Sequence, residues 1–403
     1  MNSTVDPSAW LCTDPLPAHR YRALVREMNL RGSKWDTQQG DAAVLAPFAL
    51  ILPRDEWTLL AYLAEQLTAE LLALEAELQD RPDLWPCLGL PRWLRAVMQG
   101  PEPWSPSAAR VMRYDFHPTP DGWKISEVNS DVPGGFNEAS AFTQLMAAGY
   151  PGSTTAGDPL AALGTALAES AGRTDPVVLL SAPGYPEDYQ VTAGLAEALR
   201  LQGVSTLLAQ PTQVSWRDGV AMVGNIRAGC LYRFYQGEWL NRVSAENRRP
   251  FFRGGCTPVC NPGSALLSES KRLPLLWSEL SASTSTWRQL LPETTAPFPP
   301  GARSAEEWLL KPAFCNTGEA VFGAGLASRG HRRLAQLHAL IQPRRWIAQR
   351  RFQILPLSTP AGLVYPCIGV YTINGSACGL YGRFSPQPVI DYAASDIALL
   401  LHE

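Results

Sequence analysis

The sequence predicts a mixed α/β protein built from roughly two or three packed units. Leucines at steps of three and four between residues 55 and 78 favour a long amphipathic helix, and polar residues at every second position between 111 and 129 favour a β-hairpin. Between 175 and 209, two short apolar runs enclose a helical pattern, which is typical of an α/β unit. The length of 403 residues exceeds one small core, because domains typically hold about 100 to 200 residues.

The leucine-rich helix dominates the N-terminal segment, residues 1–109. We expect this helix to begin at Asp55, because aspartate is a residue type that caps helix N-termini well. Its apolar face is most simply explained as core. That face consists of Leu59, Leu60, Leu63, Leu67, Leu71, Leu74 and Leu78.

The next part, residues 110–174, begins with the predicted hairpin. Successive strand side chains point to opposite faces, so Arg113 and Asp115 share one face of the first arm. Glu127 and Asn129 share a face of the second arm in the same way, and pairing of the arms would bring the four side chains together. Two carboxylates and an amide carbonyl are hard oxygen ligands, which suit Mg²⁺ bound together with phosphates. A surface hairpin with a salt bridge explains the same spacing and stays open.

The last two parts are predicted to alternate strands and helices. In the α/β unit, residues 175–262, a strand at Val177–Ser181 precedes a helix over 187–203 and a strand over 205–209. Apolar runs at 220–223 and 230–234 are expected to extend the same sheet. The final part, residues 263–403, is predicted to contain strands at 308–311 and 346–352, a helix at 332–341, and a strand-rich segment at 364–381 broken by a turn at Asn374 and Gly375.

A lysine followed by glycines in the final part is a candidate phosphate site. Lys311 lies at a strand end, and Gly318, Gly323 and Gly325 follow it, so an ammonium and backbone amides can meet phosphates. No GK[ST] follows the glycines, which excludes a Walker A loop. An ordinary glycine-bearing hairpin remains an equal alternative.

Two further basic residues are weak candidates when each is taken alone. Lys271 opens an apolar stretch in SESKRLPLLW, where a solvated lysine is the simpler explanation. Arg383 lies at a predicted strand end in LYGRF, where a guanidinium could stabilise a transferring phosphoryl group.

Composition and charge exclude several functional classes. A net charge of −3 leaves no broad cationic field, so nucleic acid is not expected as a partner. The start of the chain has no signal-peptide pattern, and no run approaches the ~20 apolar residues of a membrane span, so we expect a cytoplasmic protein without a membrane partner. The eight cysteines are expected to be reduced, and Cys256 and Cys260 lack the second pair of a structural zinc site.

Read together, the motifs resemble the glutathionylspermidine synthase-like branch of ATP-grasp enzymes. The resemblance runs from about residue 35 to the C-terminus, and the acidic hairpin precedes both lysines, as in the permuted arrangement of that branch. It implies an ATP-grasp fold in permuted order with a small Rossmann-like substrate domain. The matching motifs are KWD (34–36), RYDF, EVNSD, YRFYQGEWL (232–240), SESKRLPLLW (268–277), LLKPAF (309–314), WIAQ (346–349) and CGLYGRF (378–384).

The resemblance also implies a role for each motif residue and the cofactors ATP and Mg²⁺. The metal would be held by Asp115, Glu127 and Asn129, and the nucleotide by Lys271, Lys311, Gln349 and the loop around Gly318. Arg113 and Arg383 would contact the phosphoryl group during its transfer. Glu187 and Asp188 match a position where relatives recognise the amine, although acids in a helix's first turn are favoured by the helix dipole in any case.

The reaction implied is amide formation between a small carboxylate and an amine through an acyl phosphate. Two alternatives stay open: a catalytically silent Mg·ATP-binding sensor or scaffold, and a phosphotransferase that stops at the phosphorylated carboxylate. Many relatives carry hydroxyl residues at the positions of Val132 and Gly134, so the resemblance does not extend to glutathione as substrate. A homodimer is implied by the resemblance alone.

Overall fold

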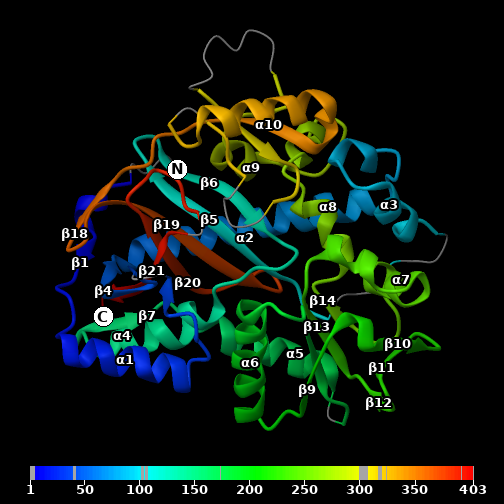
Figure 1. Ribbon diagram of the computed structural model, residues 1–403, viewed down its shortest axis with the longest axis horizontal. Coiled ribbons are helices and arrows are strands. Elements are labelled where there is room, and N and C mark those ends of the chain that lie inside the picture. The colour runs from blue at the N-terminus through cyan, green and yellow to red at the C-terminus, as the bar shows by residue number, and fades with distance from the viewer. Residues whose placement is uncertain are drawn as a thin grey trace.

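The computed structural model describes residues 5–39, 42–100, 104, 108–172, 174–298, 307–315, 320–323, 325–391 and 393–402. Its central feature is a nine-stranded sheet in the order β1-β4-β21-β20-β19-β5-β6, with β7 paired to β21 and β18 to β19 (Figure 1). The mixed α/β class is therefore confirmed. The strands are β1 (Leu11–Cys12), β4 (Leu45–Leu52), β5 (Val111–Thr119), β6 (Gly122–Asn129), β7 (Ser153–Thr155), β18 (Leu357–Thr359), β19 (Gly362–Ile373), β20 (Ser376–Ser385) and β21 (Ser395–His402).

Both faces of this sheet are covered. Along β4, Phe48 and Leu50 belong to the core shared with α2, whereas Ala49 and Ile51 belong to a second cluster on the opposite face. The sequence of β4, LAPFALIL, is a continuous apolar run. Both faces of the strand are apolar because each is buried against a different layer of helices. The second cluster includes Phe142, beside α4 (Thr143–Ala147).

The long helix α2 (Arg54–Gln79) crosses behind the sheet and packs against β19 and β20 (Figure 1). Pro53, not Asp55, occupies the N-cap position, so the predicted cap is wrong by two residues. Asp55 lies instead in the first turn, where a carboxylate interacts favourably with the helix dipole. The leucine face is confirmed as core: Leu60, Leu67, Leu71, Leu74 and Leu78 are fully buried, and Leu59 and Leu63 pack against them partly buried.

A second, parallel sheet has the order β14-β13-β8-β9. It consists of β8 (Val177–Ser181), β9 (Thr206–Ala209), β13 (Cys230–Phe234) and β14 (Val259–Cys260), and is packed by α5 (Pro159–Ala171) and α6 (Pro186–Leu201).

The expectation that residues 220–223 extend this sheet is wrong. β11 (Val220–Val223) pairs antiparallel with β10 (Val214–Arg217) and β12 (Ile226–Arg227) in a separate sheet. Asp218 and Gly219 both have positive φ, of 50° and 76°, and form a two-residue turn. Such a turn folds the strand back on its neighbour, because its twist suits a hairpin.

A third sheet, β15-β17-β16, lies above the large one and carries α10 (Arg329–Ile341) (Figure 1). Its strands are β15 (Thr294–Thr295), β16 (Trp308–Pro312) and β17 (Trp346–Arg350); the last two lie close to the predicted ranges, and β15 was not predicted. The predicted break between β19 and β20 is also confirmed: Asn374 and Gly375 have φ of 50° and 90°, as a two-residue hairpin turn requires.

The other described elements are short strands, 3-10 turns, a π-helical turn at Glu138–Phe142 and the helices α1 (Ala18–Leu30), α3 (Arg92–Met98), α7 (Ala245–Arg253), α8 (Leu266–Glu269) and α9 (Ser285–Leu290). Within the described residues, no helix combines the length and apolar character needed to cross a bilayer.

Candidate active site

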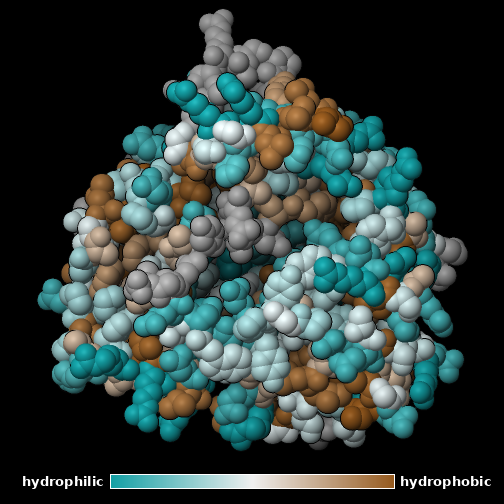
Figure 2. Space-filling view, in the orientation of Figure 1, coloured by the Kyte–Doolittle hydropathy of each residue, from teal (hydrophilic) through white to brown (hydrophobic). Residues whose placement is uncertain are grey.

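A cavity of about 470 Å³ is lined by residues from all four parts of the chain. The molecular face in Figure 2 is hollowed near its centre, and hydrophilic residues lie deep in the hollow. Eight of the predicted site residues line the cavity: Arg113, Asp115, Glu127, Asn129, Glu187, Asp188, Lys311 and Arg383. Lys271 and Gln349 adjoin it through contacts with Glu127 and Lys311. Gly318 lies outside the described residues.

The hairpin positions its polar side chains by pairing and by a bulge. Arg113 on β5 lies opposite Asn129 on β6, as the predicted pairing requires. The register shifts between Tyr114 and Phe116, so Asp115 faces two residues of β6, Ser126 and Glu127. A bulge re-aims the side chains of the strand that contains it. The convergence predicted for the four polar residues is confirmed, and the bulge is a feature that alternation alone did not predict.

Arg113 and Asp115 form a buried two-point ion pair. Arg113 Nε and Nη2 donate to the two carboxylate oxygens of Asp115 at 2.7 and 3.0 Å, and Asn129 Nδ2 approaches the same carboxylate at 3.3 Å. Burial alone would raise the pKa of Asp115, but the Arg113 guanidinium outweighs it and holds the pKa below its usual range. Asp115 is therefore a carboxylate at neutral pH.

Glycines make room for the Arg113 side chain. A Cβ on Gly369, which pairs with Asp115 across β19 and β5, would come within 2.8 Å of Arg113 Cδ. Arg113 Nη1 donates to the carbonyl of Gly134 at 2.7 Å, and Gly135, at φ 87°, passes so close to Tyr381 that a Cβ would clash with its ring. The carbonyl of Gly134 therefore helps to orient Arg113.

The donor set fits a hard divalent ion that arrives with phosphates. Asp115 and Glu127 supply carboxylate oxygens, and Asn129 supplies an amide oxygen once its side chain is turned about its last bond. Among the described residues there is no group of three His, Cys, Asp or Glu side chains arranged to hold a metal by themselves. Mg²⁺ usually retains waters and substrate phosphates as ligands, so a sparse protein contribution suits it.

Lys271 lies against the acidic hairpin. Its ammonium is 3.2 Å from Glu127 Oε2 and donates to the Cys315 carbonyl at 2.9 Å. Burial disfavours the charge, but the neighbouring Cys315, Glu127 and Glu269 outweigh it and raise the pKa of Lys271. The lysine thus stays charged in the folded protein.

Lys311 joins the small upper sheet to the hairpin. Its ammonium donates to Gln349 Oε1 at 2.7 Å and to the Ser126 carbonyl at 3.4 Å. Burial lowers the pKa of Lys311, only partly offset by Glu127. An anion placed beside this lysine would restore the preference for the charged form.

Part of the cavity wall is apolar. Its lining there comes from the upper sheet and from the segments that follow β17 and β20, and includes Leu309, Val321, Phe352, Ile354, Val389 and Ile390. A flat heterocycle suits such a surface, because apolar walls favour burial of a ring without demanding many polar partners.

Arg383 lies near a buried acid that the sequence did not single out. Arg383 Nη2 donates to the Asp391 carbonyl at 2.7 Å, and Nε lies 4.0 Å from Asp396. Tyr381 donates to the same carboxylate at 2.7 Å. Burial, followed by the charge of Glu138, raises the pKa of Asp396 to about 6.

A lysine-centred acidic cluster forms another part of the cavity lining. Lys34 Nζ lies 2.6 Å from Glu138, 3.0 Å from Asp36 and 3.9 Å from Asp396. The sequence marked only the KWD motif here. Glu138 and Asp396 were missed because they come from segments far apart in the chain and carry no local pattern. Both line the cavity.

Glu187 and Asp188 lie in the first turn of α6, as predicted, and line the same cavity. Burial, followed by the charge of Glu187, raises the pKa of Asp188 to about 6.

His117 also lines the cavity and was missed by the sequence analysis. Burial lowers its pKa to about 4, and its ring contacts the Pro366 carbonyl at 3.2 Å, so it is neutral at physiological pH.

A second cavity, of about 630 Å³, includes Glu238 in its wall. Burial, followed by the charge of Asp131, raises the pKa of Glu238 from 4.5 to about 7. Between these values the folded protein binds more protons than the unfolded chain, so stability falls as pH rises. We expect Glu238→Gln to raise the melting temperature by about 1–3 °C at pH 8 and to leave it unchanged at pH 5. Thermal denaturation at both pH values checks this, and an equal shift at both contradicts it.

Residues 22–400 match the family described as glutathionylspermidine synthase preATP-grasp, so the chain belongs to this family. The fold and family are those of ATP-grasp-type ligases. No curated protein matches the sequence.

Solved structures that match this chain include the following two. The chain resembles a glutathione synthetase-like effector from Globodera pallida in its apo form, with 13% identity, a TM-score of 0.61 and coverage of 96% of this chain and 98% of that one. It also matches a putative gamma-glutamylcysteine synthetase from Methylobacillus flagellatus, with 11% identity, a TM-score of 0.45 and coverage of 81% and 88%. At 13% identity, the similarity to the Globodera pallida structure shows a shared fold.

Proposed function

We propose that the protein is an ATP- and Mg²⁺-dependent ligase that joins a small carboxylate to an amine. One observation carries the proposal: the acidic hairpin near residue 120 and the two lysines from the last third of the chain share one site, with Lys271 3.2 Å from Glu127. The carboxylates and the amide offer oxygen ligands for Mg²⁺, and the buried ammonium groups offer positive charge for a triphosphate.

The nucleotide lies across the cavity from its apolar to its polar part. The adenine ring packs against the apolar part, and Lys311 and Lys271 contact the phosphates. Asp115, Glu127 and Asn129 would hold Mg²⁺, which when bound neutralises phosphate charge. Gln349 keeps Lys311 directed into the cavity through their 2.7 Å hydrogen bond.

The two arginines lie where charge develops. The γ-phosphoryl group passes to the substrate carboxylate, so the bond to the β-phosphate oxygen breaks and an acyl phosphate forms with release of ADP. The amine then attacks the acyl carbon, loses a proton and expels phosphate. Arg113 and Arg383 stabilise the transferring group electrostatically. Because water would hydrolyse the acyl phosphate, enclosure of the site favours amide formation.

The amine binds at the acidic part of the lining. There Asp36, Glu138, Asp396, Glu187 and Asp188 outnumber the single lysine, Lys34. This excess of negative charge favours a cationic amine. Residues 175–262, which supply Glu187 and Asp188, act as the substrate domain.

The raised pKa of Asp188 predicts a pH effect on amine binding. Its carboxyl group is neutral below pH about 6 and charged above it. The KM for the amine is therefore expected to fall by up to about fivefold between pH 5 and pH 7.5. This is the effect on binding expected from one additional, partly exposed ion pair. Steady-state kinetics of wild type and Asp188→Asn check this. A pH dependence that persists unchanged in Asp188→Asn would assign the effect to another group.

A substrate screen tests the proposed function directly. The purified protein is incubated with Mg·ATP and panels of carboxylates and amines, and ADP, phosphate and amide product are measured. Product formation that needs both substrates supports the ligase. Binding of Mg·ATP in calorimetry without turnover for any pair would favour a silent sensor or scaffold. Product trapped by hydroxylamine but by no amine would favour a phosphotransferase.

A further inference from the structure

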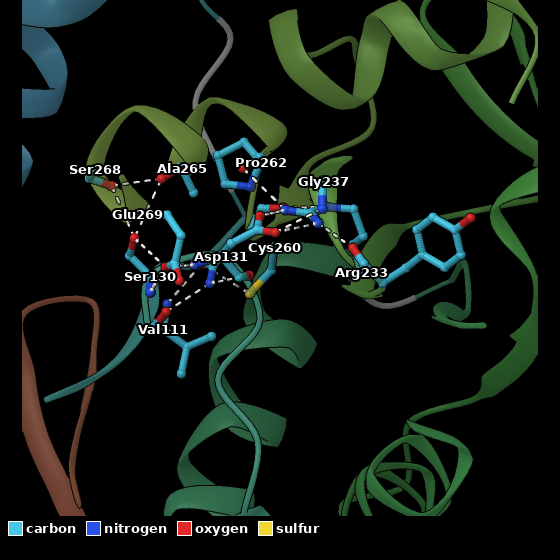
Figure 3. A network of polar contacts seen from close by, with 12 residues as sticks. Val111, Ser130, Asp131, Arg233, Gly237, Cys260, Pro262, Ala265, Ser268 and Glu269 are labelled. Atoms are coloured by element: carbon cyan, nitrogen blue, oxygen red, sulfur yellow. Dashed lines mark hydrogen bonds and ion pairs between the residues drawn. The ribbon is translucent and has the colours of Figure 1, made fainter. Parts of the chain in front are cut away.

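A buried polar network fixes the turn that follows β6 (Figure 3). Glu269, at the end of α8, points its Oε2 at this turn. That oxygen accepts the backbone N–H groups of Ser130 at 2.6 Å and Asp131 at 3.0 Å, and the Ser130 hydroxyl lies 3.1 Å from it. Ser130 and Asp131 are 0% and 2% exposed. One carboxylate oxygen therefore satisfies two buried donors that have no strand partner.

The other side of the turn is held by the parallel sheet. Asp131 forms an ion pair with Arg233 of β13 and accepts the N–H of Gly237 at 2.8 Å. Asn261, which follows β14, donates to the Asp131 carbonyl at 3.1 Å and pairs with the backbone of Val111 at the start of β5. The turn is thus clamped between Glu269 and the parallel sheet, and cannot shift without breaking buried hydrogen bonds.

The clamp connects two parts of the candidate site. Asn129 immediately precedes the clamped turn, and Glu127 lies two residues before it. On the other side, Lys271 follows Glu269 by two residues and contacts Glu127 at 3.2 Å. Glu269 therefore sets the distance between the metal-ligand strand and the lysine segment. Within the described residues, no other carboxylate has hydrogen bonds to the backbone of both residues of this turn.

We propose that Glu269 is a positioning residue, which aims Asn129 and Lys271 at a bound Mg·nucleotide through the Ser130–Asp131 backbone. This inference rests on the proposed function. Glu269 does not line the main cavity; it lines a small pocket beside it, together with Glu127 and Lys271. Partners of this kind behind metal ligands typically change metal affinity by about 10–100-fold when removed.

Glu75 provides a matched control. It is also a buried carboxylate of the same network, 4% exposed against 8% for Glu269, and it pairs with Arg110 at 2.7 Å and accepts from Ser268 at 2.6 Å. It has no contact with the Ser130 or Asp131 backbone among its hydrogen bonds. Glu75→Gln therefore weakens the network without releasing the turn.

The test compares Glu269→Gln, Glu269→Asp, Glu75→Gln and wild type. Binding of a non-hydrolysable ATP analogue is measured by calorimetry over a Mg²⁺ series, and folding is checked by circular dichroism and thermal denaturation. Glu269→Gln is expected to weaken analogue binding and to raise the half-saturating Mg²⁺ concentration, each by about tenfold or more. Glu75→Gln is expected to lower the melting temperature and keep both binding values close to wild type.

The outcomes separate this inference from the proposed function. If wild type binds Mg·analogue and folded Glu269→Gln binds it equally well, the positioning role is overturned. It is also overturned if Glu75→Gln weakens binding as much, because general destabilisation then explains the effect. If Glu269→Gln fails to fold, Mg·analogue binding by Glu269→Asp is compared with wild type instead. This variant keeps the carboxyl group on a shorter side chain, and equal binding would overturn the positioning role. If wild type binds no Mg·nucleotide, the proposed function fails first.

Discussion

Replacing Lys311 with methionine is expected to lower kcat/KM for ATP by about 100- to 1,000-fold, the cost of losing one buried charged donor at a phosphoryl-transfer site. Lys311 is 5% exposed and bonded to Gln349 at 2.7 Å. Strand β16 contains no second cationic side chain that could replace it. Methionine keeps the side-chain length and apolar stem. Because burial already disfavours the lysine charge, the variant is expected to fold as stably as wild type.

The measurement is steady-state ADP release together with binding of the ATP analogue. Arg333→Met, at an exposed cation on α10, is the matched control and is expected to leave both values unchanged. Undiminished ATP turnover in Lys311→Met would remove this lysine from the nucleotide site.

Asp115→Asn is expected to reduce turnover by about 1,000-fold or more, because it affects two functions at once. The amide is a weaker Mg²⁺ ligand than a carboxylate, and the guanidinium of Arg113 loses its buried counter-charge. A lower melting temperature and a higher Mg²⁺ requirement are both expected. The melting temperature reports on the ion pair, and the Mg²⁺ requirement reports on the metal site.

Asp121→Asn, at the exposed turn of the same hairpin, is the control for Asp115→Asn. It changes the same charge at a distance from the cavity, so turnover and Mg²⁺ dependence should stay at wild-type values. If Asp115→Asn lowered stability but left the Mg²⁺ requirement unchanged, Asp115 would be a structural partner of Arg113 only.

Local patterns predicted the elements well. The leucine helix, the β5–β6 hairpin, the strand at Val177–Ser181 and the β19–β20 turn were all predictable, because each depends on short-range periodicity or on turn residues. The errors have local causes as well. At Asp55 the preceding proline occupies the cap position, and at 220–223 a turn at Asp218 and Gly219 redirects the strand.

The candidate site was only partly predictable. Alternation placed Arg113 with Asp115 and Glu127 with Asn129, and the pairing of Arg113 with Asn129 brings the two arms together as expected. The cluster around Lys34 was not predictable, since Glu138 and Asp396 have no periodic relation to it or to each other. The clamp by Glu269 was missed for a related reason: its partners are backbone N–H groups, which no sequence motif marks.

The sequence by itself determined which side chains share a face, which segments are apolar enough to be buried, and a net charge that disfavours nucleic acid as a partner. Only the tertiary structure decided which cation meets which carboxylate, for example that Lys271 rather than Lys311 contacts Glu127 directly. The physical reason is range. Backbone sterics and side-chain periodicity act over a few residues, whereas ion pairing and desolvation depend on atoms that packing brings together from distant parts of the chain.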